Sequence, residues 1–220
     1  MLMCFSAEAS FSAAALLAAV GYATVSDTKN KQELCLAAIP FIFAMQQFAE
    51  GLLWVAITYD MMNSVLGLIG KYIFLFIAFV NWPLWLPMSF YLTENQTFRR
   101  NIIGACFIAG LIFVIWNLTI ASGKPIEVEI VGHSIQYSAY DPAAHAEFVL
   151  MRFFYVAAVL IPTFASSYRY MWIFGLVATA TFLMAEYFYH FTFTSVWCFF
   201  AAVASATLFL ILRANRRYSL

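Results

Sequence analysis

Three polar side chains interrupt the apolar segment at residues 35–58, and they are the first candidates for chemistry. Gln46, Gln47 and Glu50 lie in this segment, followed by Trp54. On a helix Gln46 and Glu50 stand one turn apart, and Gln47, Glu50 and Trp54 share one face. A carboxylate at membrane depth costs about 2.5–3.5 kcal/mol. We therefore expect Glu50 to face the bundle interior and to be protonated, ion-paired or bound to a cation. A polar cluster that only packs helices together is the alternative.

The composition is that of an integral membrane protein. Of the 220 residues, 65% are hydrophobic and only 10% are charged, whereas ordinary soluble domains carry about 25% charged residues. The mean hydropathy of +0.85 agrees. The net charge is zero, so nothing indicates a nucleic-acid partner. The cysteines, at 4, 35, 106 and 198, have no CxxC spacing, which leaves a zinc ribbon unsupported.

Apolar segments predict an all-α fold of seven transmembrane helices in a single domain that covers residues 1–220. The predicted spans are about 8–25, 35–58, 65–91, 102–121, 147–166, 170–190 and 192–212. Most connections are short, so successive helices should be antiparallel neighbours. The last two spans have almost no connection between them, and the chain must turn sharply there. The N-terminus lacks a basic region before its apolar stretch, so we expect no cleaved signal peptide.

The basic residues predict the orientation of this bundle. Eight Lys and Arg residues, at 29, 31, 99, 100, 169, 213, 216 and 217, fall on one side, and three, at 71, 124 and 152, fall on the other. The positive-inside rule then puts the N-terminus outside and the C-terminus in the cytoplasm. The long loop 122–146 becomes extracytoplasmic. Residues 126–130 and 134–138 alternate apolar and polar side chains around Gly132, which predicts a small β-hairpin between helices four and five. It is either a lid or a plain surface hairpin.

The remaining costly polar residues fall in the outer half of the predicted bundle. They are Asn117 on the fourth helix, Arg152 on the fifth, Glu186 and His190 one turn apart on the sixth, and Cys198 on the seventh. Together with Glu50 they predict one polar cavity that opens outward beneath the long loop. The inner half has no comparable set, so a continuous ion pathway is not indicated.

Charge balance in this cavity points to a cation. Glu8, Glu50 and Glu186 face two permanent cations, Lys71 and Arg152, so a third carboxylate must be protonated, paired with a histidinium or bound to a metal. We therefore predict Glu50, Glu186 and His190 as catalytic and metal-binding residues, for zinc or another divalent ion. The predicted ligand-binding residues are Gln46, Gln47, Trp54, Asn117, Arg152 and Cys198. As alternatives, Lys71 can snorkel to the interface and His190 can be a structural residue.

Three motifs resemble those of a family of bacterial seven-span membrane proteins of unknown function. They are MCFSAEASF at residues 3–11, the segment from Pro40 through QQFAEG to Trp54, and SVWCFFAA at residues 195–202. The resemblance covers most of the chain. It implies the seven-span topology and a bacterial cytoplasmic (inner) membrane, but no chemistry.

A weaker likeness is to the alkaline ceramidase and adiponectin-receptor superfamily, whose members are metal-dependent hydrolases of lipid amides. Their last span carries a His-x-x-x-His segment around a Trp. Here Thr194 and Cys198 stand at those two positions beside Trp197, and both histidines are missing. A metal would therefore need Glu50, Glu186 and His190, with Cys4 or Cys198 as a further ligand.

Three functions remain open. The first is binding or sensing of a small amphiphilic ligand in the outer cavity, by a protein whose other partner is membrane lipid. The second is metal-dependent hydrolysis of a lipid-like amide or ester, by a metal-activated water. The third is transport, which the missing inner polar path and the absence of an internal repeat disfavour. Cys4 and Cys198 are either thiols or, if their Cα atoms approach within about 7 Å, a disulfide.

Overall fold

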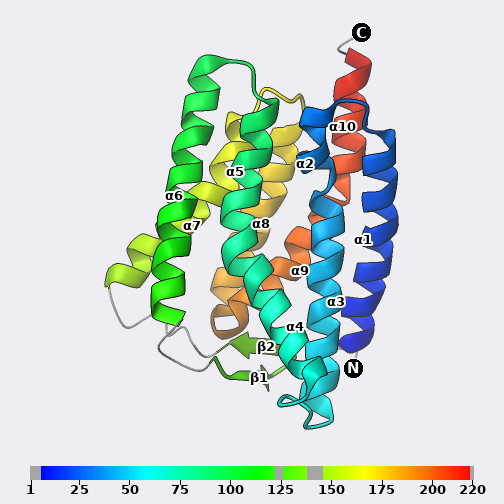
Figure 1. The fold of residues 1–220 in the computed structure, drawn as a ribbon, viewed down its shortest axis with the longest axis vertical. Helices are drawn as coiled ribbons and strands as arrows, with labels where there is room; N and C mark the ends of the chain where they lie inside the picture. Colours follow the sequence, from blue (N-terminus) through cyan, green and yellow to red (C-terminus); the bar gives the residue numbers. More distant parts are fainter. Residues whose placement is uncertain (1–5, 122–125, 138–145, 219–220) are drawn as a thin grey trace.

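The computed structural model describes residues 6–121, 126–137 and 146–218. Long helices run side by side between the two ends of the molecule, and a two-stranded sheet lies at one end (Figure 1). The helix α1 (Ala7–Asp27) begins at the sheet end, and α10 (Thr207–Tyr218) ends at the opposite end (Figure 1). These two ends are called the hairpin end and the tail end below.

Six helical segments in the described ranges are long and apolar enough to cross a membrane. They are Ala7–Asp27, Lys31–Thr58, Val65–Thr93, Thr97–Thr119, Met171–Phe188 and His190–Arg216. The fifth predicted span corresponds to α7 (Ala146–Ala165), whose part Val149–Ala165 is a shorter apolar helix. The fold is therefore that of a helical, multi-pass membrane protein with six candidate spans.

The second helix in this set is the centre of the bundle. A 3-10 turn, η1 (Lys31–Glu33), and a short helix, α2 (Leu34–Ala37), precede the helix α3 (Ile39–Thr58). The helix α3 contacts α1, α4 (Val65–Phe76), α9 (Phe193–Ser205) and the sheet. Of this segment 67% is buried, more than of any other candidate span. The neighbour α1 approaches closely because Gly51 lacks a side chain: a Cβ there would lie 2.6 Å from the Phe11 ring. Glu50 thus sits on the most enclosed helix of the fold.

A proline deforms the third predicted span. The helix α4 (Val65–Phe76) passes into a π-helical segment, η2 (Ile77–Asn81), before α5 (Trp82–Thr93) begins. Pro83 has no N–H, and its ring would clash with the carbonyl four residues earlier in a regular helix. The chain widens instead, and the Trp82 N–H bonds to the carbonyl of Ile77, five residues back. This wide turn leaves the carbonyl of Ala78 without its usual donor and orients Trp82 into the bundle, where it is 2% exposed.

Two neighbouring helices, α6 (Thr97–Ala121) and α7, accommodate this wide turn. The Tyr155 hydroxyl of α7 donates to the freed Ala78 carbonyl at 3.0 Å. Gly110 of α6 lies so close to α5 that a Cβ there would be 2.0 Å from the carbonyl oxygen of Pro83. The irregularity that Pro83 imposes is therefore accommodated by a hydroxyl donor on one helix and by a missing side chain on another.

The sheet is an antiparallel hairpin of β1 (Val128–Val131) and β2 (Ser134–Tyr137). Val131 pairs with Ser134, so the turn consists of two residues, and Gly132 takes a φ of +63° that glycine adopts without strain. The two strands differ in burial: β1 is largely exposed, whereas Tyr137 of β2 is buried and stacks on Phe74 of α4 at 4.9 Å. Lys71 also holds the hairpin, since its Nζ donates to the carbonyl of Ile126 at 2.9 Å.

The chain reverses at the hairpin end between the last two predicted spans. The helix α8 (Met171–Phe188) ends there, and the 3-10 turn η3 (His190–Thr192) leads directly into α9. A short break at Ala206 separates α9 from α10. β2 contacts both η3 and α9, so this reversal packs against the inner strand of the hairpin.

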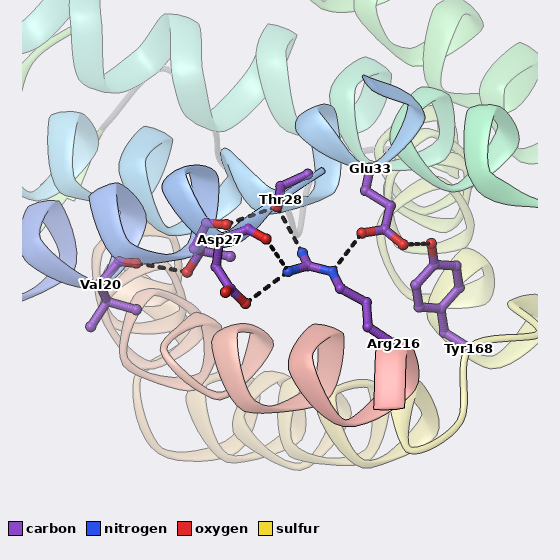
Figure 2. A network of polar contacts seen from close by, with 7 residues as sticks. Val20, Asp27, Thr28, Glu33, Tyr168 and Arg216 are labelled. Atoms are coloured by element: carbon purple, nitrogen blue, oxygen red, sulfur yellow. Dashed lines mark hydrogen bonds and ion pairs between the residues drawn. The ribbon is translucent and has the colours of Figure 1, made fainter. Parts of the chain in front are cut away.

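At the tail end, one arginine joins distant parts of the chain (Figure 2). Arg216 of α10 donates to the Glu33 carboxylate at 2.9 Å, to Oδ2 of Asp27 at 2.8 Å and to the Thr28 hydroxyl at 2.8 Å. The Tyr168 hydroxyl donates to the other Glu33 oxygen at 2.8 Å. The tail end is thus closed by a continuous network of charged and polar contacts that starts from the last helix.

Candidate functional site

The Glu50 cluster lies at the hairpin half of α3 and joins α3 to α9. Glu50 is 1% exposed. Its Oε1 accepts from the Ser195 hydroxyl at 2.5 Å, and its Oε2 accepts from Nε2 of Gln47 at 3.3 Å. In the described part of the chain no Lys, Arg or His lies within ion-pair distance of Glu50. The carboxyl therefore has hydrogen-bond donors but no countercharge.

The neighbouring amides leave polar atoms without partners. Gln46 accepts from the indole Nε1 of Trp82 at 2.8 Å, which is the contact that the wide turn in the third span makes possible. Its own Nε2 has no hydrogen-bond partner among the described residues, and neither has Oε1 of Gln47. Both glutamines are 0% exposed. Buried polar atoms are nearly always paired, and each exception calls for an explanation such as a water or an ion.

Tyr137 of the hairpin belongs to the same cluster. Its hydroxyl is buried and also lacks a partner within the described ranges. Burial raises the pKa of this hydroxyl well above its usual range, and the nearby Glu50 and Cys198 raise it further. The hairpin thus contributes an unpaired phenol to a buried set of side chains from α3 and α9.

The Arg152 cluster is separate and lies where α8 gives way to η3. Arg152 of α7 pairs with Oε2 of Glu186, and Oε1 of Glu186 lies 3.3 Å from Nδ1 of His190. The guanidinium also stacks on two rings, at 4.7 Å from the centroid of Phe193 and 5.7 Å from that of Phe182. Both carboxylate oxygens of Glu186 therefore lie against a nitrogen atom of a neighbouring side chain.

A pocket of about 390 Å³ adjoins this cluster. One wall is the hairpin turn, residues 131–134, and the other is the chain reversal, residues 188–192. The walls are mainly apolar and aromatic, and their polar groups are the two imidazoles of His133 and His190, the Tyr189 phenol and the hydroxyls of Ser134 and Thr192. Such a combination of an apolar wall with a few polar groups is typical of small-molecule sites.

The predicted site residues are thus divided between two clusters. Among the described residues, no contact joins Glu50 with Glu186 or with His190, and no three His, Cys, Asp or Glu side chains are grouped to hold a metal ion. The prediction of one zinc or other divalent metal site at Glu50, Glu186 and His190, with metal-dependent hydrolysis there, stays a prediction that no observed ligand group supports.

The other predicted residues have these places. Lys71, expected as a countercharge or a snorkelling residue, donates from its Nζ to the Ile126 carbonyl ahead of β1. Trp54 is buried one turn beyond Glu50. Asn117 of α6 is buried, and its Nδ2 has no partner in the part of the chain that is described. Cys198 is a buried free thiol on α9, and Cys4 lies outside the described residues.

Sequence reasoning missed several members of these clusters. Ser195 and Tyr137 lie far along the chain from Glu50, and nothing in their local sequence indicates this contact. His133 lies in the hairpin turn, and its local sequence does not indicate that it lines a pocket. One signal for Trp82 was present: the Pro83 that follows it predicts a helix irregularity.

Comparison with known proteins identifies the family. The family of unknown function DUF6629 matches residues 3–219, almost the whole chain, so the protein belongs to it. No curated protein and no solved structure matches the chain. The three motifs quoted above, and the weaker likeness to the alkaline ceramidase and adiponectin-receptor superfamily, stay predictions.

Proposed function

We propose that this member of DUF6629 is a seven-span protein of the bacterial cytoplasmic membrane that binds or senses a small anionic amphiphile. The proposed binding site is the pocket between the hairpin turn and η3. One observation carries the proposal: the pocket combines an aromatic wall with two imidazoles, directly beside a carboxylate that already has its countercharge.

Seven spans require α7 to cross the membrane together with the six longer segments. In support, α7 is a 20-residue helix that packs against α5, α6 and α8. The orientation follows the basic residues, eight of which fall at the tail end by sequence position. With that end in the cytoplasm, the hairpin and the pocket face the outside.

The chemistry of the pocket favours an acyl chain with an anionic head. Phe188 and Phe191 line it and are 70% and 75% exposed, which makes them a surface for an apolar chain near the membrane interface. Because Arg152 already neutralises Glu186, the site carries no surplus negative charge that would repel an anion. His133 and His190 then supply hydrogen bonds to the head group, and positive charge when they are protonated.

Binding of a fluorescent fatty acid, dansyl-undecanoic acid, to the purified protein in nanodiscs tests this proposal. We expect saturable binding that unlabelled long-chain fatty acids displace. The variants His190→Ala and His133→Ala should each weaken binding by about ten- to a hundredfold, because a lost hydrogen bond to a charged group corresponds to about 1.5–3 kcal/mol.

The matched control is Tyr187→Ala. This side chain lies next to the pocket residues and is 82% exposed, but it does not line the pocket. The Tyr187 ring packs edge-on against the pocket residue Phe188, with 4.8 Å between the ring centroids, but it supplies no hydrogen-bonding group to the pocket, so the affinity should stay close to the wild-type value. Equal affinities for the wild type, both histidine variants and the control would refute the proposed site, as would probe uptake no greater than that of empty nanodiscs.

A further inference from the structure

The Glu50 cluster poses a separate question, because it buries a potential negative charge that no side chain in the described ranges neutralises. The two cations expected as countercharges have other partners: Lys71 donates to the Ile126 carbonyl, and Arg152 pairs with Glu186. A carboxylate taken out of water without compensation costs several kcal/mol. Something that is not a side chain of the described residues must therefore balance Glu50.

Several side-chain oxygens belong to the residues that contact Glu50 or pack near it. The Gln47 amide donates to Glu50 through Nε2, so its unpaired Oε1 lies only a few ångströms from the carboxylate. The Ser195 hydroxyl of α9 is in contact with Glu50, and the strand β2, which carries the unpaired Tyr137 hydroxyl, packs against α9. Both unpaired atoms are buried, on residues 0% and 7% exposed.

We propose that Glu50, Gln47, Ser195 and Tyr137 form a buried binding site for one monovalent cation, and that Na⁺ is the ion that this ligand set suits. Carboxylate, amide and hydroxyl oxygens are hard ligands, which prefer hard cations over zinc or copper. A single carboxylate balances one positive charge, whereas a divalent ion would leave an excess charge in the bundle. The cation would explain at once the missing countercharge and the two unpaired oxygens.

The position of the site links it to the hairpin. Tyr137 is the last residue of β2, and its ring is fixed by the parallel stack on Phe74. The Tyr137 hydroxyl can therefore serve as a ligand only while the hairpin is packed against the helices. Cation binding and packing of the hairpin against the helices should stabilise each other, because both require the same position of Tyr137.

The test is a sodium titration of the purified protein in detergent, at constant pH and with choline chloride keeping the ionic strength constant. Thermal unfolding is followed by tryptophan fluorescence, and binding of radioactive ²²Na⁺ is measured directly. In the wild type, Na⁺ should raise the unfolding temperature. At a Na⁺ concentration 100 times the dissociation constant, the folding equilibrium should shift about 100-fold.

Three variants separate the ligands from their surroundings. Glu50→Gln should abolish both the sodium effect and ²²Na⁺ binding. Tyr137→Phe keeps the stacked ring and removes one oxygen, so it should weaken Na⁺ affinity about tenfold, which is in the range measured for groups that support metal sites. Glu186→Gln removes a carboxylate from the other cluster and should leave the Na⁺ affinity unchanged.

Several outcomes would overturn the proposal. One is an unfolding temperature that is the same in Na⁺, K⁺ and choline. Another is a sodium effect that survives Glu50→Gln, or that Glu186→Gln removes. A wild type that responds to pH but not to Na⁺ would also reject the cation site, and a bound proton would then be the countercharge. If Glu50→Gln does not fold, unchanged Na⁺ affinity in Tyr137→Phe decides against the site.

Discussion

Removing Arg216 should destabilise the folded protein far more than removing Arg213 of the same helix. Its guanidinium donates to Asp27 and to Glu33, and these two partners differ in burial: the Asp27 side chain is 45% exposed, whereas that of Glu33 is 9% exposed. An exposed ion pair contributes about 0.2–1 kcal/mol, and a buried hydrogen bond between charged groups contributes about 1.5–3 kcal/mol. We therefore expect Arg216→Ala to lower the free energy of unfolding by about 2–4 kcal/mol, mostly through Glu33.

The assay is reversible unfolding by SDS in mixed micelles, followed by circular dichroism, with Arg213→Ala as the control. Arg213 is an exposed residue on the same helix, at 5.8 Å from the Phe209 ring, so its removal should cost less than about 1 kcal/mol. In Arg216→Ala the buried Glu33 carboxylate keeps only the Tyr168 hydroxyl as a partner, and this unpaired charge causes most of the loss of stability. Adding Glu33→Gln to Arg216→Ala should therefore restore part of the stability.

Double-mutant cycles then compare the two partners. The coupling energy between Arg216 and Glu33 should exceed that between Arg216 and Asp27 by at least about 1 kcal/mol. If Arg216→Ala and Arg213→Ala behave alike, or if the Asp27 coupling is the larger, then burial does not decide which contact stabilises the tail end, and the reasoning fails.

Three further predictions concern packing, pH and orientation. Gly110→Ala should destabilise the protein by about 1–3 kcal/mol or more, since its Cβ would lie 2.0 Å from the Pro83 carbonyl oxygen. The control Gly104→Ala, with no contact nearer than 3.5 Å, should be neutral or stabilising in the same unfolding assay. Burial raises the pKa of Glu94, but hydrogen bonds from Gln96, Ser167 and the Asn95 backbone together lower it below its usual range. Its stabilising contribution is therefore present above about pH 4.3 and lost as the pH falls through the lower folded-state value, so Glu94→Gln should flatten the acid limb of a stability–pH profile. In a cysteine-free background, a cysteine at Glu129 should react with a membrane-impermeant maleimide in intact cells and one at Asn95 should not; the reverse result would overturn the proposed orientation.

The sequence was sufficient for the features that depend on local regularity. Apolar length alone predicted the helical segments. The i,i+4 spacing of Glu186 and His190 predicted that the two side chains share a helix face; α8 ends at Phe188, before His190, but Oε1 of Glu186 and Nδ1 of His190 still lie 3.3 Å apart. The alternation in residues 126–130 and 134–138 predicted a hairpin, and the structure has β1 and β2 there. In each case the signal and the structure extend over the same few residues.

What could not be predicted is which distant side chain completes each cluster. Ser195 contacts Glu50 across 145 residues, and Arg216 contacts Glu33 across 183. The rotation of each helix about its own axis determines which side chains come into contact. That rotation depends on the packing of all the helices together. The division of Glu50 from Glu186 has the same cause: Glu50 is buried against Ser195, whereas the Glu186 side chain is 31% exposed and pairs with Arg152.

The polar side chains at the two ends of the bundle differ in how completely they are hydrogen-bonded, and this difference indicates which end can move. At the tail end, Arg216, Glu33 and Tyr168 all have charged or polar partners at normal hydrogen-bond distances. Towards the hairpin end, two buried side chains, Gln47 and Tyr137, keep an atom without a partner in the described structure. A fully paired network must lose several contacts at once to open, whereas unpaired polar atoms gain contacts when a ligand or water arrives. Conformational change linked to binding should therefore be confined to the hairpin, η3 and the start of α9, with the tail end acting as the fixed base.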